Sequence, residues 1–255
     1  MPLIGRRLIS AYVWVAWTIL VIIWTPLVFA TFLLTFWWDP GRRISGRLFH
    51  SAAAVAVLLN PLWRVSVVGR RPAGSDHPFV AVCNHESLAD VILVGSLPWE
   101  MKWLSKRAIA RLPFVGWMMT LIGDIAVTRR DPESRQRAFE AMKDRITRGM
   151  SIMIFPEGTR SRTTDMLPFR NGAFRLAIET QVPVLPLVVS GTRDSIRSGS
   201  LLFNPADVTV RILEPIEVTG LSESDVESLR DRVQALIDSA RRDGAAQGRA
   251  TGTGS

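Results

Sequence analysis

The stretch FVAVCNHESLAD (79–90) joins a buried strand to the start of a helix, and it decides the fold prediction. Residues 79–83 carry no polar side chain except the thiol of the last one, so we expect a strand covered on both faces, as in a parallel sheet. Ser87 suits the cap of a helix that continues to Leu97. A covered strand that runs directly into a helix is typical of an α/β domain.

The alternation of strands and helices continues along the chain. Runs of β-branched and other apolar residues predict further strands at 62–69, 101–105, 125–129, 151–155, 182–190 and 207–213. Helical patterns are expected at 132–149, 172–180 and 222–242. We therefore predict an α/β fold with a mixed, largely parallel sheet flanked by helices. The two prolines within 182–190 favour an edge or end position for that strand.

A long apolar segment precedes this domain. Residues 11–38 contain no charged side chain but five of the nine tryptophans. As a straight helix they would reach roughly 42 Å, more than the ~30 Å of a hydrocarbon core. Pro26 lies near the middle and is expected to kink such a helix. A secretory signal or a buried soluble helix is the alternative, but the segment is long for either.

A second apolar segment, at 48–63, is broken by Pro61, and the basic segment DPGRRISGR (39–47) separates the two. Arg6 and Arg7 precede the first apolar segment, so basic residues stand at both of its ends. A spanning helix would put one of these two basic clusters outside, against the positive-inside tendency. We therefore favour an N-terminal apolar two-helix hairpin associated with the membrane from one side over a true span. The predicted division is the hairpin at 1–61, the α/β domain at 62–243 and a disordered tail at 244–255.

Composition and charge favour an anionic partner. The 31 Lys and Arg outnumber the 23 Asp and Glu, which gives a formal net charge of +8. A nucleic acid, a membrane surface or a phosphorylated substrate would suit this charge, and solubility alone is the plain alternative. Cys83 is the single cysteine, which excludes an internal disulfide and fits a reducing compartment.

His85 and Asp90 are the first candidates for chemistry. A neutral imidazole accepts a proton near pH 7, and a carboxylate on its other nitrogen fixes its tautomer. Five residues turn a helix by about 140°, so the two side chains meet only if His85 lies in the turn before the helix. A structural hydrogen bond at a helix start is the alternative. We expect no metal site, because the other histidines, His50 and His77, form no cluster with ligand spacing.

A second candidate stretch is IFPEGTRSR (154–162), where an apolar strand runs into a Pro/Gly loop. Gly158 lets the backbone approach a ligand closely, and Arg160 offers a planar fork of donors that suits a phosphate. An ordinary turn with an exposed ion pair is the alternative.

Together the two stretches resemble the glycerolipid acyltransferase family that includes the 1-acylglycerol-3-phosphate acyltransferases. The resemblance rests on N-H-x-x-x-x-D followed about seventy residues later by F-P-E-G-T-R-S. Two further blocks stand in the family's order, GDIAVTRR with Arg129 in the basic position and VPVLPL at 182–187. The likeness extends over about residues 60–220.

The resemblance implies the activity and the roles of the site residues. His85 would be the general base and Asp90 the residue that orients it, so that the sn-2 hydroxyl of lysophosphatidate attacks an acyl thioester directly and yields phosphatidate. The acyl donor would be an acyl-carrier-protein or coenzyme A thioester, with no cofactor and no metal. The implied substrate-binding residues are Lys106, Arg129, Glu157, Gly158, Thr159 and Arg160.

The resemblance also implies a place in the cell and leaves alternatives. The catalytic domain would lie on the cytoplasmic face of the inner or plasma membrane. Another lyso-lipid or glycerol-3-phosphate could be the acceptor, and a membrane-associated lipid hydrolase or scaffold is the alternative class. Nucleic-acid binding is disfavoured, because the arginines are dispersed and the aromatic residues gather in the apolar N-terminus.

Overall fold

The computed structural model describes residues 2–70, 77–161, 163–197 and 199–251. The stretch RRPAGSDHP (70–78), whose turn-forming residues predict a loop, therefore lies largely outside the described residues. The strands are β1 (Trp63–Val68), β2 (Val80–Cys83), β3 (Lys102–Lys106), β4 (Ile125–Val127), β5 (Ile152–Ile154), β6 (Val184–Ser190) and β7 (Ala206–Ile212). The helices are α1 (Leu3–Thr35), α2 (Arg43–Leu58), α3 (Ala89–Gly95), α4 (Arg107–Ala110), α5 (Val115–Ile122), α6 (Pro132–Thr147), α7 (Gly172–Thr180) and α8 (Val226–Thr251), with a 3-10 turn η1 (Glu223–Asp225) before α8.

The seven strands form one sheet in the order β1-β7-β6-β2-β5-β3-β4. Every neighbouring pair is parallel except β6 and β7. This confirms the predicted mixed, largely parallel sheet flanked by helices.

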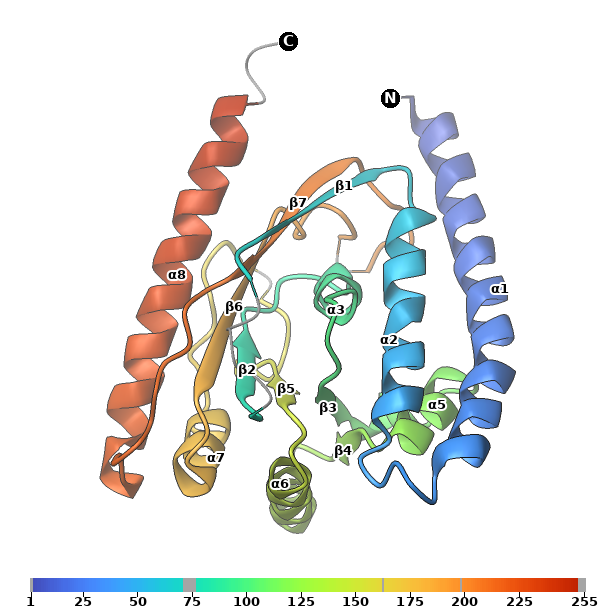
Figure 1. Ribbon diagram of the computed structural model, residues 1–255. Coiled ribbons are helices and arrows are strands. Elements are labelled where there is room, and N and C mark those ends of the chain that lie inside the picture. The colour runs from blue at the N-terminus through green and yellow to red at the C-terminus, as the bar shows by residue number, and fades with distance from the viewer. Residues whose placement is uncertain (1, 71–76, 162, 198, 252–255) are drawn as a thin grey trace.

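The sheet lies between two helical layers, with α1 and α2 on one side and α6, α7 and α8 on the other (Figure 1). Strand β2 contributes to both faces, because Ala81 and Cys83 join the cluster under α1, α2 and α3 while Val80 and Val82 join the cluster under α6 to α8. The four residues of β2 are buried, as the unbroken apolar run predicted.

Strand β6 is central, and its predicted edge position is wrong. It pairs with β2 on one side and with β7 on the other. Pro186 is tolerated because it stands opposite Leu213, just beyond the end of β7, and its carbonyl oxygen still accepts the Leu213 N–H at 3.0 Å. Pro183 precedes the strand and accepts the Val80 N–H at 3.0 Å. Neither proline removes a donor from the interior of a regular ladder.

The N-terminal helices differ in detail from the expected segments. Helix α1 continues through Pro26 as one element, and α2 begins at Arg43, inside the predicted basic linker. The two helices lie side by side (Figure 1), where Trp17 Nε1 donates to the Ala56 carbonyl at 2.9 Å and Trp24 Nε1 to the Leu48 carbonyl at 2.9 Å.

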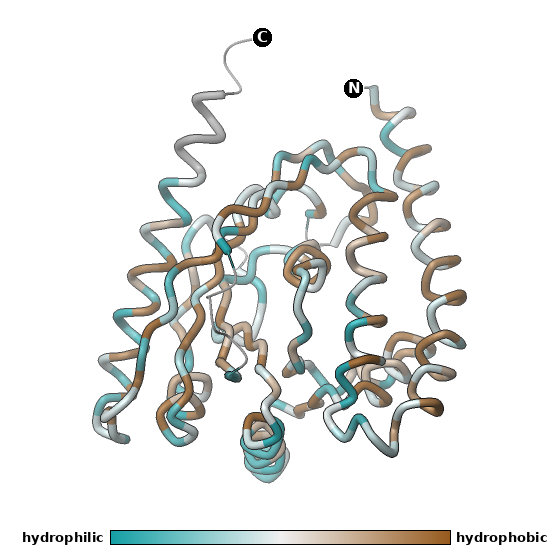
Figure 2. The backbone as a smooth tube through the Cα atoms, in the orientation of Figure 1, coloured by the Kyte–Doolittle hydropathy of each residue, from teal (hydrophilic) through white to brown (hydrophobic). Residues whose placement is uncertain are grey.

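Helix α1 is apolar along most of its length (Figure 2). Among the described residues it is the one helix that is long and apolar enough to cross a membrane, by length and composition. Membrane association of the α1–α2 pair as a hairpin stays a prediction. The C-terminal helix α8 follows a capping box formed by Ser222 and Asp225, and it extends beyond residue 242 to Thr251, where a tail was expected from Gly244. Residues 252–255 of that tail lie outside the described part.

Candidate active site

The predicted site residues gather at one edge of the sheet. His85 follows β2, Glu157 follows β5, Lys106 ends β3 and Arg129 follows β4. These four strands are parallel, so their carboxyl ends meet at the same edge. Ligands of open α/β sheets bind outside that edge.

His85 and Asp90 form a hydrogen-bonded pair within the turn between β2 and α3. The His85 Nδ1 lies 2.9 Å from Asp90 Oδ2, and Asp90 is fully buried. The same oxygen accepts the backbone N–H groups of Glu86 at 2.6 Å and Ser87 at 2.8 Å. Because a carboxylate only accepts, Nδ1 carries the proton and Nε2 keeps its lone pair. Ser87 is predicted as the cap of a helix that continues to Leu97, whereas α3 begins at Ala89 with Leu88 at the cap position and ends at Gly95.

The turn is held from two neighbouring strands, β6 and β5 with the loop that follows it. The Asn84 side chain makes two 2.9 Å hydrogen bonds to the backbone of Val189 in β6. The His85 N–H donates to Glu157 Oε1 at 2.7 Å, and the His85 carbonyl accepts from Ser161 at 2.9 Å. The imidazole stacks on Phe155, with ring centroids 4.2 Å apart. The His85 side chain is therefore fixed in both position and ring orientation.

Glu157 joins two loops of the site. Its Oε1 accepts the His85 N–H, and its Oε2 accepts the Leu167 N–H at 2.9 Å. Burial raises the pKa of this carboxyl, and the two backbone N–H donors oppose the rise. The Glu157 carboxylate accepts from backbone N–H groups and does not line the cavity that His85 lines. Its place in the structure is therefore to hold the turn in position.

That cavity has a volume of about 740 Å³ and two chemically different parts. Its apolar wall comes from α1, α2, α3 and α5 and includes Trp17, Leu20, Ala53, Ala56, Ile92, Val115 and Met118. Its basic wall includes Lys106, Arg129, Arg135 and Arg170. His85 lines the same cavity, which therefore combines an imidazole with apolar and basic side chains.

Gly158 lies against the basic wall in a conformation that favours glycine. Its φ is +72°, and a Cβ atom there would lie 2.9 Å from Nε of Arg170. Burial lowers the pKa of Arg129, and the charge of Arg170 lowers it further. Two neighbouring guanidinium groups that disfavour each other's charge suit an anion between them.

The predicted substrate-binding residues are thus only partly brought together. Lys106, Arg129 and Gly158 line the cavity, whereas Thr159 and Arg160 are exposed and do not belong to its described lining. Sequence reasoning missed Arg135, Arg170 and Phe155. Arg170 stands in the stretch LPFRNGAF, which follows the FPEGTR block closely enough to have drawn attention. The sequence does not single out Arg135, because its helix is rich in charged residues, as solvent-exposed helices are.

Comparison with known proteins shows which family the chain resembles. Residues 64–190 match the family model described as Acyltransferase. The chain is 35% identical over 67% of its length to a chloroplastic 1-acyl-sn-glycerol-3-phosphate acyltransferase of Brassica napus, and spans about half (51%) of that relative. It is 32% identical over 74% of its length to the human 1-acyl-sn-glycerol-3-phosphate acyltransferase alpha, of which it covers 68%.

A solved structure is similar over nearly the whole chain. The crystal structure of the 1-acyl-sn-glycerophosphate acyltransferase from Thermotoga maritima superimposes with a TM-score of 0.82 at 26% identity. The match covers 95% of this chain and 97% of the other.

Proposed function

Because the chain belongs to the glycerolipid acyltransferase family that includes the 1-acyl-sn-glycerol-3-phosphate acyltransferases, we propose that it converts lysophosphatidate to phosphatidate. The reaction is acyl transfer from a thioester to the sn-2 hydroxyl. The observation that carries the proposal is the His85–Asp90 pair at a cavity with one apolar and one basic wall.

The proposed mechanism needs no protein nucleophile. His85 Nε2 takes the proton of the sn-2 hydroxyl while the hydroxyl oxygen attacks the thioester carbonyl carbon. The tetrahedral intermediate collapses, the C–S bond breaks, and the leaving thiolate takes the proton from the imidazolium. Asp90 stabilises that imidazolium through Nδ1. General base catalysis of this kind supplies about 10²–10⁴-fold.

The structure narrows the choice of oxyanion donors. The backbone N–H groups of Glu86 and Ser87 at the helix start already donate to Asp90 Oδ2. We therefore expect the donors for the tetrahedral oxyanion to be groups other than these two N–H groups.

The partners follow from the two walls of the cavity. Lys106, Arg129 and Arg170 would hold the acceptor phosphate, and the apolar wall would take an acyl chain. The donor is an acyl-carrier-protein or coenzyme A thioester, and no cofactor or metal is required. The α1–α2 pair would hold the enzyme at the membrane, with the catalytic domain on the cytoplasmic face. Glu157 and Gly158 would shape the acceptor site, and Thr159 and Arg160 would act from its outer rim.

The test is product formation from labelled lysophosphatidate with either thioester, using wild type, His85→Ala and the matched control His77→Ala. His77 is exposed and lies outside the site. We expect thioester-dependent phosphatidate from wild type and the control, and a loss of at least about 10²-fold in His85→Ala. Release of free fatty acid instead would identify a hydrolase. Absence of phosphatidate but acylation of another lyso-lipid would change the acceptor.

A further inference from the structure

Glu86, the neighbour of the proposed base, is buried between two arginines. Its side chain is 8% exposed, and its Oε1 lies 3.4 Å from the Arg193 guanidinium and 3.3 Å from that of Arg241. Burial raises the pKa of the Glu86 carboxyl, and the two guanidinium groups act against that rise. Burial of a carboxylate with two cations costs desolvation free energy, and removal of either cation destabilises the fold because the carboxylate loses a partner.

The two arginines come from distant parts of the chain. Arg193 lies in the loop after β6, and Arg241 lies on α8. Arg241 also donates to the Thr164 carbonyl at 3.0 Å and pairs with Asp238 at 2.8 Å. The bridge Arg193–Glu86–Arg241 therefore ties the turn that holds His85 to the loop after β6 and to the C-terminal helix.

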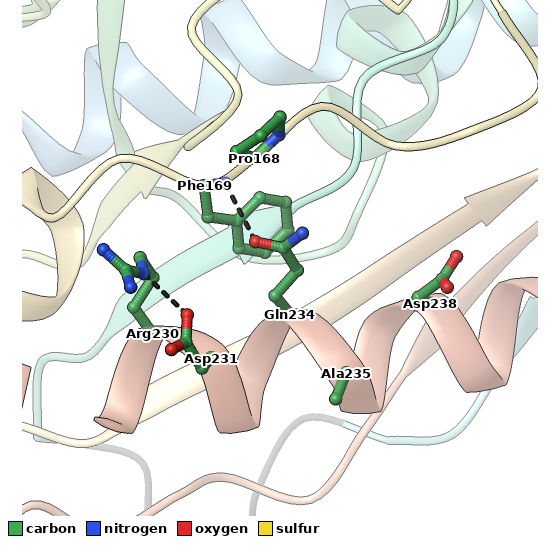
Figure 3. Close-up of a pocket in the computed structure, with 7 residues that line it drawn as sticks. All are labelled: Pro168, Phe169, Arg230, Asp231, Gln234, Ala235 and Asp238. Atoms are coloured by element: carbon green, nitrogen blue, oxygen red, sulfur yellow. Dashed lines mark hydrogen bonds and ion pairs between the residues drawn. The ribbon is translucent and has the colours of Figure 1, made fainter. Parts of the chain in front are cut away.

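Helix α8 makes a second contact with the site loops, one that Figure 3 shows. The Gln234 side chain on α8 accepts the Phe169 N–H at 2.9 Å. Phe169 directly precedes Arg170 of the basic wall, and the nearby Leu167 N–H donates to Glu157. The helix thus supports both sides of the candidate site without lining the cavity.

The charge around His85 is arranged in layers. Asp90 in α3, Glu157 after β5 and Glu86 in the turn itself are the carboxylates nearest to it along the chain or by contact. Arg193 and Arg241 stand behind Glu86, and Asp238 stands behind Arg241. Lys106, Arg129, Arg135 and Arg170 line the same cavity as His85.

We propose that the bridge Arg193–Glu86–Arg241 is a positioning device that holds the catalytic turn and sets the proton affinity of the His85 imidazole. The Glu86 backbone N–H donates to Asp90, so movement of Glu86 is passed to the His85–Asp90 pair. Because Glu86 directly follows His85, its negative charge would favour the imidazolium, and the charges of the two arginines would oppose that effect. The catalytic meaning of the bridge rests on the proposed function, whereas the effect on His85 does not.

The experiment is a ¹³C NMR titration of the histidine rings in the detergent-solubilised full chain. The sequence has only three histidines, so loss of one signal in His85→Ala assigns the resonance. We expect Glu86→Gln to lower the His85 titration midpoint, and Arg193→Gln and Arg241→Gln to raise it, each by about 0.5 pH unit or more. The acid limb of the kcat/KM profile should move in the same directions.

Two matched variants serve as controls, Glu133→Gln and Arg197→Gln, because both side chains are exposed in ion pairs elsewhere. A merely structural role would lower the melting temperature without midpoint shifts of opposite sign. Midpoints that stay within the spread of the controls, or that shift in one direction for all three variants, would overturn the proposal. If Glu86→Gln does not fold, the two arginine variants decide the sign. A wild type that titrates normally but makes no phosphatidate would overturn the proposed function instead.

Discussion

At the residue scale, Gly158 shows how one backbone position can control an anion site. Its φ of +72° disfavours any side chain, and a Cβ would press on Nε of Arg170 at 2.9 Å. Gly220 has a similar φ of +82° but open space around it. An alanine there would strain the backbone without displacing a neighbour, so Gly220 is the control for Gly158.

We predict that Gly158→Ala raises KM for lysophosphatidate about tenfold or more, because Arg170 must move, and costs about 1 kcal/mol of stability from the backbone. Gly220→Ala should show a similar loss of stability with an unchanged KM. Steady-state kinetics and thermal melting measure the two effects. Equal KM changes in both variants would show that Arg170 does not bind the acceptor.

The sequence carried the pairing of His85 with Asp90, because a conspicuous spacing stood at a strand-to-helix turn. It could not show that Glu157 faces two backbone N–H groups, since a carboxylate within a motif gives no sign of its direction. Nor could it show that Thr159 and Arg160 turn outward, because the positive φ of Gly158 redirects the chain just before them.

At the scale of elements, Asp124 connects β3 to the start of the edge strand β4. Its Oδ1 accepts the Trp103 N–H at 2.9 Å, and its side chain lines the inner cavity. Burial raises the pKa of this carboxyl from 3.8 to about 7. Between these two values the folded protein binds a proton that the unfolded chain releases, so stability falls as pH rises from about 4 to about 7.

We predict that Asp124→Asn flattens this part of the stability profile, because the amide oxygen can still accept the Trp103 N–H without becoming charged. The variant should gain on wild type as the pH rises and be the more stable protein at pH 8. Urea unfolding between pH 4.5 and pH 8 measures the difference. A constant difference across that range would show that Asp124 does not titrate within it. Asp207→Asn, at an exposed carboxylate, is the control.

The order of elements was predictable from hydrophobic patterning, but their neighbours in the sheet were not. The prolines of β6 favour an edge or end position. The strand can nevertheless be central, because Pro186 stands opposite Leu213, just beyond the end of β7. Helix α2 begins inside a basic segment, where Asp39 Oδ2 accepts the Ile44 N–H at 2.8 Å. The Arg43 side chain also donates to the Gly149 carbonyl at 2.8 Å, a distant contact that the sequence does not reveal.

At the scale of the whole molecule, the N-terminal helices share a core with the α/β domain. Trp17 of α1 is 8% exposed and packs edge-on against Trp63 of β1 and Phe203, with centroids 5.8 Å and 5.1 Å away. Ser10 accepts the Phe203 N–H at 2.9 Å, which ties α1 to the loop before β7. A tether would need none of these contacts, so we infer that residues before β1 and after it unfold together.

Trp17→Ala tests that inference, with Trp37→Ala as the control because Trp37 is 67% exposed. Loss of a buried tryptophan costs about 3–5 kcal/mol, so Trp17→Ala should lower the single unfolding transition of the full chain in detergent micelles. Near-UV circular dichroism in a denaturant series follows the tertiary packing of both parts. Trp37→Ala should leave the transition in place, since its ring lies outside the shared core. If Trp17→Ala instead splits the curve in two and leaves the α/β transition unmoved, the N-terminal helices fold as a separate unit. In that case α1 and α2, which supply much of the apolar wall of the cavity, would fold separately, and the basic wall would remain folded without them.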